Sequence, residues 1–175
     1  AFFDVSNGGV VCEKCASGRR YPIDASVLDV GACDGKWRTL LPDYLDMDAV
    51  EVYKPNADRI AWMYRKLYNI NILDFHYDHY GLVIFGDMLE HMAVKDAQTV
   101  LKYAEEHADN ILIAIPFHYE QGALYGNPYE VHMQSDLTPE LFNERYPGYT
   151  VLLRAANDYC YYIKTAGDIC ENKRK

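Results

Sequence analysis

The fold is decided by the stretch Val27-Leu28-Asp29-Val30-Gly31-Ala32-Cys33-Asp34-Gly35. Apolar residues lead into an acid and two glycines, the pattern of a buried parallel strand that ends in a tight loop before a helix. A second apolar run ends at the acid Glu51, about 20 residues further on, where a doubly wound sheet binds the hydroxyls of a ribose. Together the two features predict an α/β fold that binds a nucleoside cofactor.

Size and charge restrict the class of protein. A chain of 175 residues is long enough for one α/β domain but too short for a second. Its formal net charge of −9 repels phosphate backbones and anionic membranes, which disfavours nucleic acid as a partner. The longest apolar run, Ile111–Phe117, is well short of the ~20 residues that a membrane span needs, so no membrane association is expected.

The cysteines and the first residues bear on the cellular setting. An odd number of cysteines in a full-sized domain fits reduced thiols better than a disulfide framework. No secretory signal is visible, because the start of the chain is neither basic nor strongly apolar. We therefore expect a cytoplasmic protein. Cys12 and Cys15 have the spacing of a metal knuckle, but no second pair follows at a suitable distance, so no metal site is predicted.

From Ser26 onward, short apolar runs alternate with helical stretches, which is typical of repeated βα units. Apolar positions at helical spacing predict helices over 57–67 and 94–108. A third helix opens at Thr138-Pro139-Glu140 and runs to Tyr146. The predicted strands are 26–31, 48–53, 70–73, 81–86 and 110–116, followed by a hairpin of 150–155 and 159–165.

These elements define an α/β fold class. The sequence predicts a Rossmann-like three-layer sandwich, with a seven-stranded, mostly parallel sheet and an antiparallel last strand. Residues 1–25 lack a clear period and are expected to form a loosely structured N-terminal arm. The cofactor-binding domain is then expected over residues 26–175.

Four motifs follow the predicted strands in order. Asp-x-Gly-x-x-x-Gly follows the first strand, an acid the second, Asp74-Phe75 the third and Leu89-Glu90-His91 the fourth. This order resembles class I S-adenosylmethionine-dependent methyltransferases of the small single-domain, type 11/12-like kind, over residues 26–165. The resemblance implies methyl transfer from S-adenosylmethionine to a small molecule or to a group appended to a larger one.

The resemblance also implies a role for each motif. The first loop would wrap the methionine part of the cofactor, and the acid after the second strand would bind both ribose hydroxyls. The third motif would clamp the adenine, and the acid after the fourth strand would lie near the methyl group. The implied cofactor-binding residues are Asp29, Gly31, Ala32, Gly35, Glu51, Val52, Asp74, Phe75 and Asp87.

The charges of these residues favour the same ligand on physical grounds. Acids at the carboxyl ends of four parallel strands suit a sulfonium, an ammonium and hydroxyls, whereas Asp34 inside the loop disfavours a pyrophosphate. Cys33 replaces the middle glycine of the usual pattern, so the loop is expected to sit slightly farther from the ligand. Two alternatives stay open: an NAD-dependent oxidoreductase, since Glu51 would serve its ribose equally well, and a noncatalytic nucleoside-binding module.

A long segment after the strand at 110–116 is expected to cap the acceptor side. It contains Asn127-Pro128-Tyr129-Glu130-Val131-His132, which is similar to a segment in a subset of small methyltransferases. An acceptor that keeps its proton needs a general base, and imidazole titrates in the right range. The candidate catalytic residues are His91, His118, Tyr129 and His132.

Overall fold

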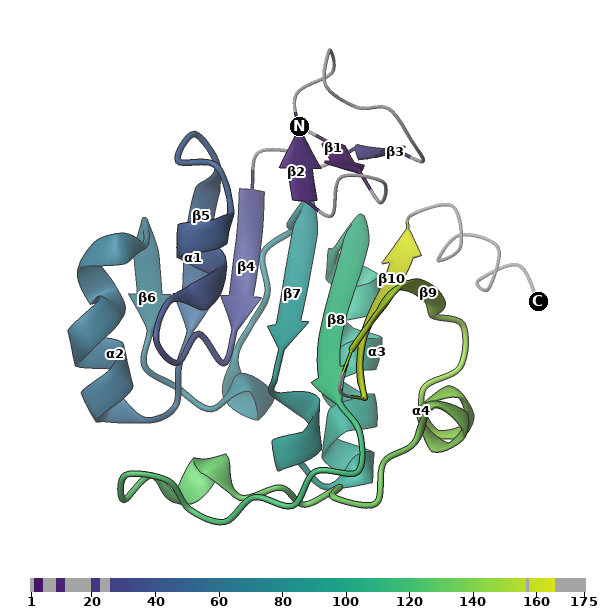
Figure 1. The fold of residues 1–175 in the computed structure, drawn as a ribbon. Helices are drawn as coiled ribbons and strands as arrows, with labels where there is room; N and C mark the ends of the chain where they lie inside the picture. Colours follow the sequence, from purple (N-terminus) through teal and green to yellow (C-terminus); the bar gives the residue numbers. More distant parts are fainter. Residues whose placement is uncertain (1, 5–8, 12–19, 23–25, 157, 166–175) are drawn as a thin grey trace.

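The computed structural model describes residues 2–4, 9–11, 20–22, 26–156 and 158–165 (Figure 1). Its strands are β1 (Phe2–Asp4), β2 (Gly9–Val11), β3 (Arg20–Pro22), β4 (Ser26–Val30), β5 (Asp46–Val50), β6 (Lys66–Tyr68), β7 (Leu82–Gly86), β8 (Asn110–Pro116), β9 (Thr150–Ala155) and β10 (Tyr159–Thr165). Its helices are α1 (Lys36–Leu40), α2 (Lys54–Ile60), α3 (Val94–His107) and α4 (Pro139–Arg145). Short 3-10 turns are η1 (Ala61–Met63), η2 (Ile72–Asp74), η3 (Leu89–His91) and η4 (Pro128–Glu130).

The main sheet, within the described residues, has seven strands in the order β6-β5-β4-β7-β8-β10-β9. The strands from β4 to β8 pair in parallel, and β10 runs antiparallel to both of its neighbours. The predicted sheet, mostly parallel with an antiparallel last strand, is therefore confirmed.

Helices pack on both faces of this sheet and give it three layers (Figure 1). Trp37 of α1 and Ile60 of α2 belong to one apolar cluster, whereas Val100 of α3 and Phe142 of α4 belong to another. The strands between the helix layers are buried on both faces, as the continuous apolar runs of the sequence predict. None of the helices in the described part of the chain is both long and apolar enough to cross a bilayer.

The direction of strand addition reverses at β4. The chain adds β5 and β6 on one side of β4, and then returns to add β7 and β8 on the other. In open α/β sheets, such a switch point opens a crevice at the carboxyl ends of the strands. Figure 1 shows the segment between β8 and α4 running beneath these ends.

Two local predictions are wrong. The third strand of the sheet is 66–68, and 72–74 is a 3-10 turn, because the Asn71 side chain accepts a hydrogen bond from Leu73 N–H and caps that turn. The helix predicted to reach residue 67 ends at Ile60. Within residues 1–25, for which an N-terminal arm is predicted, β1, β2 and β3 pair antiparallel in the order β2-β1-β3.

Candidate functional site

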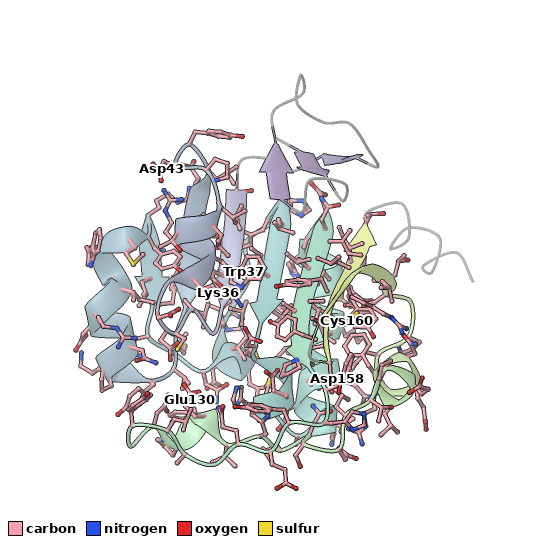
Figure 2. The ribbon with its side chains drawn as sticks, viewed as in Figure 1. Lys36, Trp37, Asp43, Glu130, Asp158 and Cys160 are labelled. Atoms are coloured by element: carbon pink, nitrogen blue, oxygen red, sulfur yellow. The ribbon has the colours of Figure 1, made fainter. Side chains whose placement is uncertain are left out.

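A cavity of about 680 Å³ lies at the carboxyl ends of the parallel strands. Its walls include the loop after β4, the ends of β5 and β7, the segment that leads into η2, the turn η3, and the long segment after β8. Figure 2 shows Lys36 and Trp37 at the start of α1, and Glu130 on the segment below the strands. The lining includes Gly31, Ala32, Glu51, Val52, Asp87, His91, Tyr129 and His132, which are among the residues predicted from the sequence.

The loop after β4 turns sharply through left-handed backbone. Gly31 and Gly35 have φ values of 72° and 81°, and Cys33 adopts φ 47° although it carries a side chain. A Cβ on Gly31 would lie 2.8 Å from Met88 Cγ, so this position has no room for one. The Cys33 side chain is exposed, while its backbone N–H points inward to Glu51. The Cys33 thiol therefore takes no part in the bond to Glu51, which comes from the backbone.

Glu51 is held rigidly at the end of β5. It is 5% exposed, and its two oxygens accept hydrogen bonds from Cys33 N–H (2.8 Å) and Tyr53 N–H (2.7 Å). Burial raises the pKa of the carboxyl, and the two backbone N–H groups oppose that rise. Each oxygen keeps a further lone pair for a ligand, because an ionised carboxylate offers about four acceptor sites.

Asp87 follows β7 and anchors a second polar group. Its side chain accepts hydrogen bonds from Lys36 Nζ (2.9 Å) and from the Tyr159 hydroxyl. Burial alone would lower the pKa of Lys36, but the hydrogen bond and charge of Asp87 raise it, so the lysine stays cationic. The preceding Gly86 has to be a glycine, because a Cβ there would lie 1.9 Å from Trp37 Nε1.

Glu90, His91 and His132 form a third group. Glu90 is 1% exposed, and neither of its carboxyl oxygens has a hydrogen-bond partner among the described residues. Burial raises the pKa of Glu90 well above its usual range. The two imidazole rings lie 4.6 Å apart edge to face, and His91 Nε2 is 3.9 Å from Glu90 Oε1. Burial, followed by the neighbouring His132, lowers the pKa of His91.

Four of the predicted cofactor residues lie outside the cavity lining: Asp29, Gly35, Asp74 and Phe75. Asp29 is buried on the face that α1 and α2 cover, where it accepts a 2.6 Å hydrogen bond from the Tyr64 hydroxyl. Burial raises the pKa of Asp29 to about 7. Asp74 is exposed, and Phe75 packs into the core. His118, one of the four candidate catalytic residues, is exposed and also lies outside the lining.

Sequence reasoning missed several residues of the cavity wall. Ile70, Asn71, Ile72 and Leu73 line it where Asp74 and Phe75 were expected. The apolar residues among 70–73 are the sequence feature that could have indicated this wall, but the same apolar run also predicts a strand. The remaining missed residues include Lys36, Trp37, Glu90 and Tyr159. Glu90 lies inside the Leu89-Glu90-His91 motif, but only the fold reveals that its side chain is buried.

No family model matches the sequence, and no curated protein matches it. Solved structures do match. The DhpI–SAH complex superposes with a TM-score of 0.62 at 14% identity, over 79% of this chain and 74% of that one. The methyltransferase domain of bacterial CtHen1 gives 0.60 at 17% identity, over 81% and 90%. The O-methyltransferase NcsB1 from neocarzinostatin biosynthesis, in complex with S-adenosyl-L-homocysteine and 1,4-dihydroxy-2-naphthoic acid, gives 0.56 at 17% identity, over 79% and 48%.

The neighbours agree on one architecture. This chain has the fold of class I S-adenosylmethionine-dependent methyltransferases, as the order of the sequence motifs predicts. At 14–17% identity, the likeness establishes the fold and leaves the ligand and the reaction to be argued from the site.

Proposed function

We propose that this chain binds S-adenosylmethionine in the cavity and transfers its methyl group to a small-molecule acceptor. The observation that carries the proposal is the charge of the cavity wall. Its acids are Asp34, Glu51, Asp87, Glu90, Asp96 and Glu130, and they stand against a single lysine, Lys36. A wall of this sign favours a ligand with a sulfonium and an ammonium, and it opposes the pyrophosphate of a dinucleotide.

The rigid part of the wall suits the nucleoside. Glu51, fixed by two backbone N–H groups, is placed to accept hydrogen bonds from the ribose hydroxyls. The apolar side chains of Ile70, Ile72 and Leu73 would then cover the adenine in place of Asp74, which is exposed. The loop at 31–35 would surround the methionine part, because its left-handed turns bring backbone close to the cavity.

Methyl transfer requires few catalytic groups from the protein itself. An electron pair of the acceptor attacks the methyl carbon, the carbon–sulfur bond breaks, and the sulfur leaves as a neutral thioether. The enzyme holds the two reactants in line and keeps water away. His91, Tyr129 and His132 line the other part of the cavity and would contact the acceptor. A small-molecule acceptor is supported by NcsB1, a neighbour in fold, which was crystallised with 1,4-dihydroxy-2-naphthoic acid.

Calorimetric titrations with S-adenosylhomocysteine and with NAD test the proposal. We expect S-adenosylhomocysteine to bind and NAD to give no heat, because the acidic wall repels a pyrophosphate. Binding of NAD without S-adenosylhomocysteine would favour an oxidoreductase. Incubation with methyl-labelled S-adenosylmethionine and pooled small-molecule acceptors then separates an enzyme from a noncatalytic binding module, which would bind the cofactor without turnover.

A further inference from the structure

Glu90, His91 and His132 bring three ligand atoms of the kind that transition metals prefer into one corner of the cavity. One carboxylate oxygen and two imidazole nitrogens lie within 4.8 Å of one another. Glu90 and His91 belong to η3, directly after β7, whereas His132 comes from the segment that runs beneath the strands. The fold, rather than the local sequence, therefore assembles the group.

Both histidines are oriented as metal ligands are. His91 Nδ1 lies 3.3 Å from the Val131 carbonyl oxygen, and His132 Nδ1 lies 2.7 Å from the Tyr119 carbonyl oxygen. A carbonyl oxygen only accepts, so each Nδ1 has to carry the hydrogen. Each Nε2 is then left as a lone-pair donor. Metal-binding histidines usually donate their other ring N–H to a backbone carbonyl or a carboxylate in this way, which fixes the orientation of the ring.

The burial of Glu90 indicates a ligand independently of the two histidines. It is 1% exposed and lines the cavity, yet neither of its oxygens has a hydrogen-bond partner among the described residues. Burying a carboxylate without a partner is expensive, whereas buried charges that persist are paired or coordinate a metal. Asp87 and Glu130 add negative charge around Glu90, and Lys36 adds a positive charge.

We infer that Glu90, His91 and His132 form a binding site for a divalent first-row transition metal. Two imidazoles and one carboxylate suit zinc, iron, manganese or cobalt, whereas calcium and magnesium prefer oxygen ligands alone. Metal bonds of about 2.1 Å place adjacent ligand atoms roughly 3 Å apart, so the side chains close onto the ion by small rotations.

Three protein ligands leave coordination positions open toward the cavity. An open position binds water or an oxygen of a substrate and lowers the pKa of a bound hydroxyl. This step rests on the proposed function: an acceptor hydroxyl would bind there, lose its proton to solvent water because the metal lowers its pKa, and attack the methyl carbon as an oxyanion while the carbon–sulfur bond breaks. His91 and His132 then serve as ligands rather than as general bases, because their Nε2 lone pairs are engaged.

Titration of the full chain with Co²⁺, followed by visible absorption, tests the inference. Co²⁺ bound to nitrogen and oxygen shows d–d bands without the near-ultraviolet thiolate bands that Cys12 and Cys15 would produce. We expect one Co²⁺ per chain. Glu90→Gln, and separately His132→Asn, should weaken binding by more than about 100-fold, because loss of a group that only hydrogen-bonds a metal ligand already costs roughly 10- to 100-fold.

His79→Asn is the matched control. This histidine also pairs with a carboxylate, since His79 Nε2 lies 3.1 Å from Asp109 Oδ1, but the pair is outside the cavity. Co²⁺ binding by this variant should equal that of the unmodified chain. The thermal unfolding of every variant shows whether it is folded. Absence of Co²⁺ binding, binding with thiolate bands alone, or unchanged binding by both folded ligand variants would overturn the inference.

A parallel titration with S-adenosylhomocysteine separates this inference from the proposed function. If S-adenosylhomocysteine binds and Co²⁺ does not, the metal site is refuted and the proposed function stands. If Co²⁺ binds through Glu90 and S-adenosylhomocysteine does not, the metal site stands and the proposed function fails.

Discussion

Glu51 and Glu90 line the same cavity, and both are buried, but they differ in their hydrogen bonding. Glu51 accepts two backbone hydrogen bonds, whereas Glu90 accepts none from the described residues. The carboxylate on the Glu51 side of the cavity is thus hydrogen-bonded by the protein's own backbone. The carboxylate on the Glu90 side has no such partner among the described residues. The comparison indicates that the Glu51 side, proposed to bind the nucleoside, is preorganised in the free protein, while the Glu90 side, proposed to bind the acceptor, is completed by a ligand.

Asp29 stands between these two cases. One of its oxygens accepts the hydrogen bond of Tyr64, and the other has no partner among the described residues. The three carboxylates therefore form a series with two, one and no hydrogen-bonded oxygens. Substitutions of the three carboxylates test whether the free energies of unfolding and of ligand binding depend on the number of hydrogen-bonded oxygens.

The largest effect is expected at Asp29, whose pKa is raised from 3.8 to about 7 by burial. When the pKa of a carboxyl is higher in the folded than in the unfolded state, its contribution to stability is fully present at a pH below the unfolded-state pKa. This contribution is lost as the pH rises through the folded-state pKa. The shift corresponds to about 4 kcal/mol. Urea unfolding should show stability falling between about pH 4 and pH 7, and Asp29→Asn should remove most of that fall. The exposed Asp78→Asn should leave it unchanged, and an equal pH dependence in both variants would contradict the assignment.

Removal of the preorganised carboxylate tests the nucleoside side. Glu51→Ala should weaken the binding of S-adenosylhomocysteine by about 1–3 kcal/mol, the scale of charge-assisted hydrogen bonds left unmade. Calorimetry measures the change, with the exposed Glu120→Ala as the control. An unchanged dissociation constant would show that the ribose lies elsewhere.

A pair of matched substitutions compares the two glutamates directly. Without metal, Glu90→Gln should raise the free energy of unfolding by about 1–2 kcal/mol, because it removes a buried charge that has no partner. Glu51→Gln should lower it, because one of two hydrogen-bonded oxygens is lost. Burial raises the pKa of Glu90, so the gain from Glu90→Gln should vanish in acid, where the carboxyl is neutral in either state. Changes of the same sign in both variants would remove the distinction between the two sides.

The sequence predicts the architecture well because periodicity and burial agree along most of the chain. The strands at 82–86 and 110–116 and the closing hairpin lie where their apolar runs place them. The third strand was misplaced for a physical reason. Ile70 and Leu73 are apolar because they line a cavity rather than a sheet, and apolar content alone does not distinguish the two.

The candidate site is less predictable, because the direction of a side chain depends on the register of its element. Asp29 lies inside β4, whose alternation places it on the face opposite Leu28 and Val30. Glu51 lies just beyond the end of β5 and reaches the cavity. The ligand atoms of Glu90 and His132 lie within 4.8 Å although the two residues are far apart in the chain, so no local pattern predicts their proximity.

The smallest effect concerns Cys33, the residue that departs from the glycine pattern on the preorganised side. Its φ of 47° is left-handed, which costs a side-chain-bearing residue roughly 1–2 kcal/mol, whereas glycine adopts it freely. Glycine in turn loses about 0.5–1 kcal/mol more on folding, because its unfolded chain is freer. Cys33→Gly should therefore raise the free energy of unfolding by only about 0.5 kcal/mol.

Affinity for S-adenosylhomocysteine should be unchanged in Cys33→Gly, because the hydrogen bond to Glu51 comes from the backbone N–H and survives the substitution. Cys33→Ala separates the two possible causes, since it removes the thiol but keeps the left-handed strain. It should be no more stable than the unmodified chain in urea unfolding. A gain in Cys33→Ala equal to that in Cys33→Gly would mean that the thiol, and not the backbone, sets the stability of this loop.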